Sequence, residues 1–265
     1  MEDLILRAAK DIMNSKYAIA LTGAGISTES GIPDFRGPSG IWTKNPEAER
    51  RAYRSYERFL ADPKGWWEER LSSPGFLGDL SKVKPNPGHY ALAQLEKIGI
   101  LKWVITQNVD ALHEKAGTQN LLEYHGNAFK LRCTSCIARF KPGEFDVKKL
   151  AEEDRLPPRC PECGGVIKSD GVAFGEPIPA DVADKSYTEA LRCDLMLICG
   201  TSAVVYPFAE LPRVARRRGN VVIIEVNAEP TPLTMSGISD YIIQGKTGEI
   251  LSRIVEEVKK LKGKA

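Results

Sequence analysis

Apolar and polar positions follow two alternating patterns along the chain. Residues 3–15 carry apolar side chains at helical spacing, and the continuous apolar run that follows, 17–21, is typical of a strand covered on both faces. The same succession continues downstream, with helices expected at 86–99, 206–219 and 248–263 and strands at 101–108, 194–200 and 221–227. Strands that alternate with helices predict an α/β fold, with a parallel sheet and helices on both of its faces.

Two segments interrupt this pattern. Residues 38–85 are rich in charged, aromatic and proline residues, and residues 130–170 contain four of the six cysteines. A chain of 265 residues is long enough for a large domain that carries a small one. We therefore expect both segments to form a small lobe, and the large domain to be assembled from residues 1–37, 86–129 and 171–265.

Four cysteines are arranged in two Cys-x-x-Cys pairs, Cys133 with Cys136 and Cys160 with Cys163. Two such pairs can place four thiolates around one Zn²⁺ ion, which leaves no open position for water and predicts a structural metal site. Two unrelated pairs or a redox couple are the alternatives. The remaining two, Cys193 and Cys199, lie in an apolar segment and are expected to be buried thiols.

The turn after the first predicted strand has the glycine spacing of a phosphate-binding loop. Gly23 and Gly25 allow a close approach of backbone to a pyrophosphate, and Ser27 lies where the next helix begins. However, Thr28 stands where the third glycine of a dinucleotide fingerprint is expected. The turn therefore indicates a nucleotide site that departs from the dehydrogenase pattern.

Polar side chains also follow the other predicted strands, at the edge where open α/β sheets bind ligands. A histidine in such a loop suits proton transfer near neutral pH, although a lone histidine is often structural, and Asn and Asp are common turn residues. The side chains in question are Gln107, Asn108, Asp110, His125, Thr201, Ser202, Asn227 and Glu229.

Composition and charge bear on the possible partners and location of the protein. The net charge of +2 does not demand a nucleic acid or an anionic membrane as partner, and the basic stretch 213–219 is read as a solvated helix face. The acidic, amphipathic N-terminus differs from a signal peptide, and no apolar run reaches the roughly 20 residues that span a bilayer. We expect no membrane association and a cytoplasmic location, where cysteines stay reduced.

Taken together, these motifs resemble the sirtuins, which are NAD-dependent protein lysine deacylases. The resemblance covers most of the chain, and its pieces occur in the family's order. They are GAGIS…GIPDFRG, TQNVDALH, the His-Gly pair at 125–126, the two Cys-x-x-Cys pairs, VAFGEPIP, GTSAVVYPFAELP and NAEP. The resemblance implies a Rossmann-like NAD-binding domain with a small zinc-binding and helical lobe.

The resemblance also implies the reaction and its cofactors. Nicotinamide is cleaved from NAD, the acyl group of a protein lysine is transferred to ADP-ribose, and one zinc ion is structural. Asn108 and His125 would be catalytic, with His125 as general base. The residues implied to bind NAD are Gly23, Ala24, Gly25, Ser27, Asp34, Phe35, Arg36, Gln107, Asn108, Asp110, Gly200, Thr201, Ser202, Asn227 and Glu229.

The substrate peptide is expected to insert between two extended runs, 172–176 and 202–207, and to contact Val172, Phe174, Gly175 and Val204. Gly171 departs from the family's usual pattern and is expected to loosen this edge. No tyrosine in residues 38–85 is followed three positions later by arginine, the motif of sirtuins that prefer acidic acyl groups, so neutral acyl groups are favoured.

Two alternative functions stay open at this point. One is mono-ADP-ribosyl transfer to a protein, which uses the same nicotinamide cleavage with another acceptor. The other is a non-catalytic, zinc-containing module that binds NAD or DNA. The two Cys-x-x-Cys pairs and the basic stretch 213–219 support this alternative. Acyl-lysine proteins are the expected partners, with DNA-associated proteins among the candidates, and the sequence makes no prediction about oligomeric state.

Overall fold

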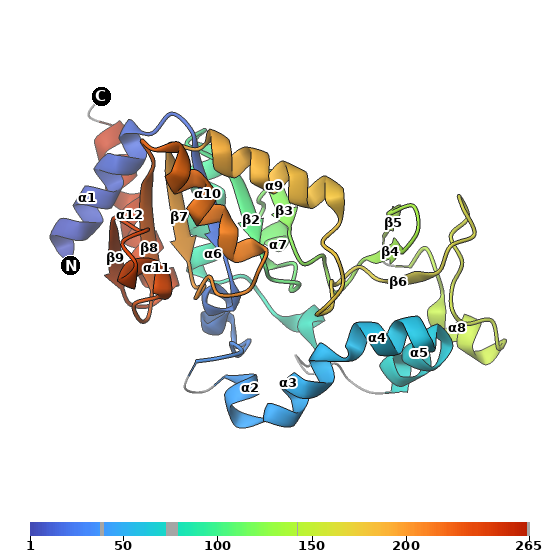
Figure 1. Ribbon diagram of the computed structural model, residues 1–265. Coiled ribbons are helices and arrows are strands. Elements are labelled where there is room, and N and C mark those ends of the chain that lie inside the picture. The colour runs from blue at the N-terminus through green and yellow to red at the C-terminus, as the bar shows by residue number, and fades with distance from the viewer. Residues whose placement is uncertain (38–39, 73–78, 142, 264–265) are drawn as a thin grey trace.

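The larger domain is built around a six-stranded sheet with the order β3-β2-β1-β7-β8-β9 (Figure 1). The computed structural model of the protein describes residues 1–37, 40–72, 79–141 and 143–263. All neighbouring strands in this sheet run parallel, which confirms the predicted α/β fold. The strands are β1 (Ala18–Thr22), β2 (Leu101–Thr106), β3 (Leu121–Glu123), β7 (Leu195–Cys199), β8 (Val222–Asn227) and β9 (Tyr241–Gln244).

Alternate side chains of each central strand enter two separate hydrophobic cores. In β1, Ala18 and Ala20 belong to one core, whereas Ile19 and Leu21 belong to the other. Every residue of β1 is buried, which explains its continuous apolar sequence. The first core is covered by α1 (Glu2–Asn14), α6 (Pro87–Lys97) and α12 (Thr247–Lys262), and the second by α9 (Ala180–Arg192) and α10 (Leu211–Arg218).

Local signals set the ends of the helices. The Asn86 side chain accepts a hydrogen bond from the Gly88 amide at the start of α6, and Gly99 follows the helix in the left-handed region at φ +83°. The helix expected at 206–219 begins later, because a 3₁₀ turn, η3 (Phe208–Glu210), precedes α10. Pro212 then occupies the first turn of α10, where its missing N–H costs no hydrogen bond.

Several short elements lack a sequence signal that predicts them. The strands β3 and β9 contain three and four residues, too few to show a period. One longer element, the 13-residue helix α9, is also absent from the helices that we predict. The other short pieces of the larger domain are η1 (Ala24–Ser30), α7 (Leu112–Lys115) and α11 (Pro232–Met235).

Parts of the two interrupting segments lie side by side, away from the large sheet (Figure 1). The first forms short helices, α2 (Ile41–Lys44), α3 (Pro46–Tyr53), α4 (Ser55–Ala61), α5 (Pro63–Ser72) and η2 (Leu80–Lys82). The second forms α8 (Val147–Glu152) and an antiparallel sheet of β5 (Arg139–Phe140), β4 (Leu131–Cys133) and β6 (Ile167–Ser169). We call it the zinc lobe. The Trp67 indole N–H joins the two by donating to the Ile167 carbonyl at 2.9 Å. The predicted boundaries 38–85 and 130–170 include residues 38–39, 73–78 and 142, which lie outside the described residues.

Across the described ranges, none of the helices is both long and apolar enough to cross a bilayer.

The strand order places a cleft at the carboxyl ends of β1 and β7. These two strands are neighbours, and the chain continues from β1 toward β2 on one side and from β7 toward β8 on the other. The loops that leave them therefore diverge, which is the arrangement at which open α/β sheets bind ligands.

Candidate active site

A cleft of about 960 Å³ opens at this edge of the sheet, a volume at the upper end of the usual range for small-molecule sites. It contains every predicted NAD-binding residue except Gly23, together with three of the four predicted peptide residues; Val204 is absent from its lining and 41% exposed. The predicted residues that line it are Ala24, Gly25, Ser27, Asp34, Phe35, Arg36, Gln107, Asn108, Asp110, His125, Val172, Phe174, Gly175, Gly200, Thr201, Ser202, Asn227 and Glu229.

Glycines bring the loops after β1 and β7 into direct backbone contact. The Gly25 amide donates to the Gly200 carbonyl at 2.8 Å, and the Gly23 amide donates to the Cys199 carbonyl at 3.3 Å. A Cβ atom at Gly200, where φ is +62°, would lie 2.1 Å from the Ile26 nitrogen. In the structure, these glycines therefore allow the two loops to pack directly against each other. Their contact with a pyrophosphate stays a prediction.

Asn108, Ser27 and Asp110 form one hydrogen-bonded group. The Asn108 amide nitrogen donates to the Gly23 carbonyl at 3.0 Å and to the Ser27 hydroxyl at 3.1 Å. The Ser27 hydroxyl donates to an Asp110 carboxylate oxygen at 2.7 Å, and the Leu112 amide donates to the other at 2.9 Å. Burial raises the pKa of Asp110, although both hydrogen bonds oppose that rise. The ends of β1 and β2 are thus fixed to each other by polar contacts.

Gln107 and the Asp34–Arg36 segment border this group. The Gln107 side chain donates to the Thr201 hydroxyl at 2.7 Å, which links the loops after β2 and β7. The carbonyls of Asp34 and Phe35 accept hydrogen bonds from α2 at 2.9 and 3.0 Å. The Arg36 guanidinium lies 4.4 Å from the centre of the Trp42 ring. The loop that the resemblance assigns to closure over NAD is therefore attached to the helical insertion.

His125 lies in the loop after β3 and lines the cleft. Its ring centroid is 5.6 Å from that of Tyr124 and 6.4 Å from that of Phe208, so one side of the imidazole is apolar. Burial lowers the pKa of His125 to about 4, opposed by a hydrogen bond with the Gln107 backbone. The ring is therefore neutral at pH 7 and has a lone pair with which to accept a proton.

The other two histidines lie behind the cleft, and the sequence analysis missed both. The Asn86 amide donates to His89 Nδ1 at 3.3 Å, which leaves the Nε2 proton to face the Ser27 hydroxyl at 3.4 Å. His113 Nε2 lies 2.9 Å from the Thr22 hydroxyl. Burial lowers the pKa of His89 to about 4 and that of His113 well below its usual value. The scarcity of histidine was a signal: all three belong to this one region.

A second missed residue is Glu225, a carboxylate in the middle of the apolar strand β8. Its side chain is fully buried and accepts hydrogen bonds from the hydroxyls of Thr231 and Thr234, each at 2.5 Å. These contacts fix the loop that carries Asn227 and Glu229 at the cleft. A buried carboxylate requires hydrogen-bond partners. The single acidic residue in an otherwise apolar strand could therefore have identified Glu225 from the sequence.

The two segments predicted to hold a peptide as extended edges are not strands. The Glu176 amide donates to the Ala173 carbonyl at 3.1 Å, so the first segment turns back on itself, and Gly175 has a φ of +80°. In the second segment Ala203 has a φ of +49°, and the Tyr206–Pro207 bond is cis. Left-handed residues interrupt an extended conformation, so neither segment is extended along its whole length, and the insertion of a peptide between them stays a prediction.

The four paired cysteines form a cluster with the geometry of a metal site. Their Sγ atoms all lie within 4.8 Å of one another, and the Cys133–Cys163 and Cys136–Cys160 separations are 3.5 and 3.6 Å. Four thiolates about 2.3 Å from one Zn²⁺ ion would be about 3.8 Å apart, whereas a disulfide needs about 2.0 Å. The cluster therefore fits the predicted structural zinc ion. Cys193 and Cys199 are buried, as predicted.

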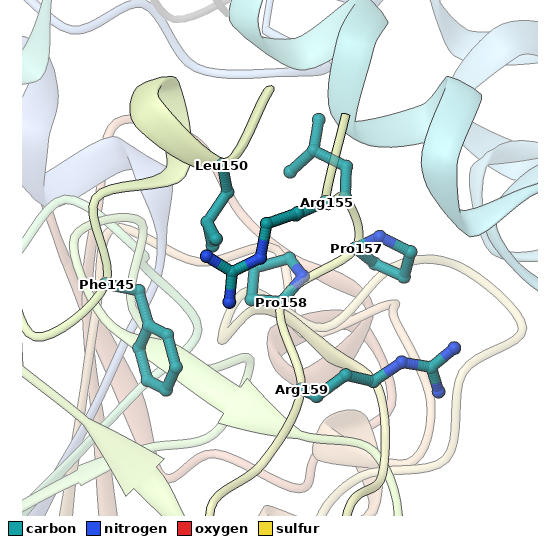
Figure 2. A pocket seen from close by; sticks show the side chains of 7 residues that line it. Phe145, Leu150, Arg155, Pro157, Pro158 and Arg159 are labelled. Carbon is teal, nitrogen blue, oxygen red and sulfur yellow. The ribbon is translucent and has the colours of Figure 1, made fainter. Parts of the chain in front are cut away.

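The zinc lobe also has a smaller groove, of about 470 Å³ (Figure 2). None of the predicted site residues belongs to its lining, which consists of Phe145, Leu150, Arg155, Leu156, Pro157, Pro158 and Arg159.

The basic stretch at the end of α10 makes contacts within the protein. Arg216 donates to the Ile238 and Val221 carbonyls, and Arg217 pairs with Glu210. Arg218 donates to the Leu191 carbonyl. These contacts agree with a helix face that is solvated and internally paired.

Comparison with known proteins identifies the family. The model of the Sir2 family matches residues 23–207. An NAD-dependent protein deacylase of Pyrococcus abyssi is 44% identical and covers 97% of this chain and 99% of its own. An NAD-dependent protein deacylase 2 of Archaeoglobus fulgidus is also 44% identical and covers 99% of both chains.

Solved structures of Sir2 proteins also match this chain. A Sir2 homologue in complex with NAD matches with a TM-score of 0.76 at 39% identity, over 98% of this chain and 94% of that one. Sir2Af2 bound to a myristoylated histone peptide matches with a TM-score of 0.70 at 38% identity, over 100% of both chains. The family model spans more than half of this chain, and the relatives match the chain along almost its whole length. This chain therefore belongs to the Sir2 family, the sirtuins.

Proposed function

We infer that this chain is an NAD-dependent protein deacylase. The relatives that match it over nearly their full length carry that name. The observation in the structure that carries the inference is the convergence of His125 with the Asn108–Ser27–Asp110 group on one cleft, at the point where the strand order reverses.

The cleft has a donor set that suits NAD. Hydroxyl groups of Ser27, Thr201 and Ser202 lie where the loops of β1 and β7 meet, and Asn227 and Glu229 lie at the end of β8. Such groups serve phosphates and ribose hydroxyls. When bound, NAD supplies a sugar carbon that becomes electrophilic as nicotinamide leaves. Asn108 and Asp110 would orient the nicotinamide end, because Ser27 holds both side chains in place.

His125 would remove a proton from a hydroxyl group during acyl transfer. The neutral ring required for this role is ensured by burial, which lowers its pKa to about 4. The apolar side that Tyr124 and Phe208 present to the ring helps to exclude water.

The acyl group would lie among aromatic side chains. Phe174 lies 4.4 Å from Tyr53 and 5.4 Å from Trp42, measured between ring centroids. Such walls favour neutral acyl groups, and the relative bound to a myristoylated peptide supports chains longer than acetyl. Arg70 lines the same cleft, so a succinyl group is the informative competitor in a test.

Acyl-lysine proteins are the proposed substrates, with histone-like and other DNA-associated proteins as candidates. Two related structures contain a histone peptide and a p53 peptide, which supports this choice. The alternatives, ADP-ribosyl transfer to a protein and a non-catalytic module, receive no support from the names of the relatives.

The decisive experiment incubates the protein with NAD and peptides that carry acetyl-, myristoyl- or succinyl-lysine, followed by mass spectrometry. We expect one nicotinamide and one acylated ADP-ribose for each lysine freed, and no NAD consumption without an acyl group. ADP-ribose attached to protein would indicate transferase activity, and binding of NAD without turnover would indicate a non-catalytic module.

The variant His125→Ala tests the assigned base. We expect the deacylation rate to fall by about 10²–10⁴-fold, the usual contribution of general base catalysis, with the Kd for NAD within about twofold of the wild type. Tyr187→Ala, at an exposed position on α9, is the control and should retain full activity.

A further inference from the structure

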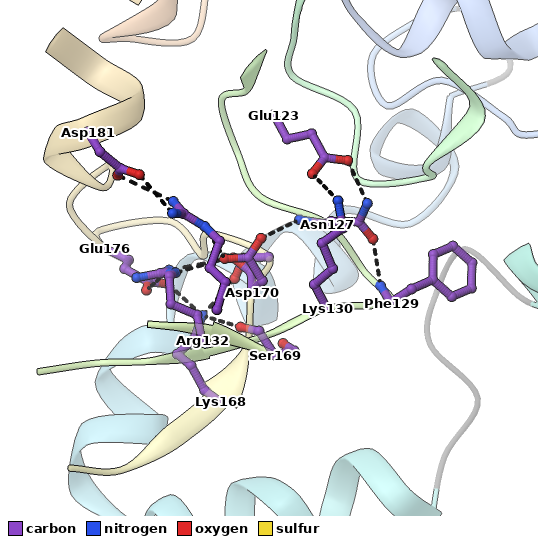
Figure 3. A network of polar contacts seen from close by, with 12 residues as sticks. Glu123, Asn127, Phe129, Lys130, Arg132, Lys168, Ser169, Asp170, Glu176 and Asp181 are labelled. Atoms are coloured by element: carbon purple, nitrogen blue, oxygen red, sulfur yellow. Dashed lines mark hydrogen bonds and ion pairs between the residues drawn. The ribbon is translucent and has the colours of Figure 1, made fainter. Parts of the chain in front are cut away.

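Four charged side chains are buried where the zinc lobe joins the larger domain (Figure 3). We call Arg132, Lys168, Asp170 and Glu176 the charge cluster; their side chains are 6%, 2%, 2% and 4% exposed. Arg132 pairs with Asp170 at 2.9 Å and with Glu176 at 2.8 Å, and Lys168 pairs with Glu176 at 3.0 Å. Two buried cations and two buried anions thus compensate one another, and the more exposed Arg139 also pairs with Asp170 at 3.6 Å.

Stability alone is a weak explanation for such a cluster. Desolvation of buried charges consumes much of their attraction, and apolar residues of similar volume often stabilise a core equally well or better. Arg132 and Lys168 come from β4 and β6 of the zinc lobe, whereas Asp170 and Glu176 lie on the segment that returns to the larger domain. The cluster therefore connects two parts of the molecule.

Two members of the cluster also bind the backbone of that segment, residues 169–176. Lys168 Nζ donates to the carbonyls of Ser169 at 2.8 Å and Gly171 at 2.7 Å. One Glu176 carboxylate oxygen accepts from the Ala173 amide at 2.9 Å. Gly171 was expected to loosen this edge of the cleft, but its carbonyl is held by a buried ammonium group.

The same segment is attached to the loop that carries His125. The Val172 amide donates to the His125 carbonyl at 2.8 Å, and the Asn127 amide donates to an Asp170 carboxylate oxygen at 3.0 Å. Between them, a Cβ atom at Gly126 would lie 2.1 Å from the Asp170 carbonyl oxygen, so no other residue fits. A displacement of Asp170 would therefore displace His125.

We propose that the charge cluster positions His125 and the peptide-binding segment 169–176 relative to each other, with Lys168 and Glu176 as positioning residues for deacylation. The inference rests on the proposed function. Neither residue needs to touch the reacting atoms, because Lys168 acts through the carbonyls of Ser169 and Gly171 and Glu176 through the Ala173 amide. Burial lowers the pKa of Lys168 to about 8, opposed by the Glu176 carboxylate, so the ammonium form still predominates at pH 7.

The test compares Lys168→Met with the double variant Lys168→Met/Glu176→Met. The single variant leaves Glu176 without its lysine partner, whereas the double variant removes both charges. If the cluster positions the backbone, both variants should reduce kcat/KM for an acetyl-lysine peptide by about 10²-fold, since small misplacements of reacting groups cost that much. The Kd for NAD should stay within about twofold, because the predicted NAD contacts lie on other loops.

Thermal unfolding separates positioning from charge balance. The double variant should recover much of the unfolding midpoint that the single variant loses, but not its kcat/KM. Recovery of both would overturn the proposal, as would parallel losses of NAD affinity and peptide turnover. Lys149→Met, which removes an exposed lysine near Glu153 in the same lobe, is the matched control and should behave as the wild type.

Hydrogen exchange makes the test independent of the activity. In Lys168→Met, the Asn127 and Val172 amides should exchange at least about tenfold faster, with no change in β7 and β8. Unchanged exchange at these two amides would refute the positioning role even if the wild type proved inactive. Absence of deacylation by the wild type would instead refute the proposed function.

Discussion

The two parts of this molecule are held together by different forces. The larger domain has two extensive hydrophobic cores, one on each face of its sheet. The core of the zinc lobe contains only four buried residues in the described range, Cys133, Phe140, Cys160 and Ile167, and two of these are metal ligands. The comparison indicates that the sheet can fold on hydrophobic burial, whereas the lobe depends on its metal and on buried charges.

The same contrast divides the cleft. On the side proposed to bind NAD, the loops are joined by close glycine packing and by amide and hydroxyl hydrogen bonds. On the side proposed to bind the peptide, segment 169–176 is joined to its surroundings by the charge cluster. Cofactor binding and peptide binding should therefore respond to different perturbations.

Removal of the metal should produce the largest difference between the two parts. Structural zinc contributes on the order of 10 kcal/mol in small domains, far more than the apolar core of this lobe can supply. After chelation or in Cys133→Ser, we expect amides of β4 and β6 to lose protection from hydrogen exchange, while those of β1 and β7 keep it. Loss of protection throughout the sheet would show that the two parts fold as one unit.

Acid should reduce the stability of the larger domain, which contains all three histidines. The folded-state pKa of His89 and of His125 is about 4, below the ordinary value near 6.5, so the unfolded chain binds more protons between these values. The stability that these two histidines contribute should thus be fully present above pH 6.5 and be lost as the pH falls to 4. For each histidine, the slope of the unfolding free energy reaches about 1.4 kcal/mol per pH unit. Over the whole interval, each histidine therefore contributes about 3 kcal/mol.

Urea unfolding at several pH values measures this loss. The buried carboxyl groups of Asp110 and Glu123, whose pKa values are raised by burial, act in the opposite direction. The variant His89→Gln isolates one histidine, and its slope should be smaller by about 1.4 kcal/mol per pH unit. An unchanged slope would contradict the assignment.

A phenylalanine in each part provides a matched pair. Phe208 is fully buried in the core beside α10, and truncation to alanine should cost about 3–5 kcal/mol of unfolding free energy. Phe140 in the zinc lobe is 8% exposed and belongs to a small cluster, so Phe140→Ala should cost less while the metal is bound. Denaturant titration of both variants checks the order, and a larger cost for Phe140 would contradict it.

Two glycines with positive φ sharpen the comparison at the level of the backbone. At Gly164 in the zinc lobe φ is +73° and an added Cβ meets nothing within 4 Å, so Gly164→Ala should cost only about 1 kcal/mol. At Gly200 the Cβ would meet the Ile26 nitrogen, so Gly200→Ala should cost more and should also weaken NAD binding. Calorimetry with NAD tests both, and equal affinities would show that the loops can separate without consequence.

The smallest effect is expected at the exposed ion pair between the two insertions. Lys64 Nζ lies 2.5 Å from Asp154, but both groups are solvated. Lys64→Ala should leave the unfolding midpoint indistinguishable from that of the wild type, because exposed pairs are screened by water and salt. A measurable decrease would show that the helical insertion and the zinc lobe depend on each other more than their buried contact at Trp67 suggests.

Several features were predictable from local sequence. Continuous apolar runs identified β1 and β7, which are buried at every position, and largely apolar runs identified β2 and β8. The four cysteines identified the metal site, because the chemistry of thiolate ligands requires that spacing. Strand ends located most of the cleft, since parallel strands direct their following loops to one edge.

The amino-acid sequence by itself thus determined the α/β class, the zinc ligands and the polar loops of the cleft, because each depends on neighbours along the chain. Only the tertiary structure decided which groups meet: His89 behind Ser27, Gly25 against Gly200, and Lys168 with Glu176 beside segment 169–176. Such contacts join residues that are distant in the sequence, and burial then fixes their pairing and protonation, a property that no local pattern encodes.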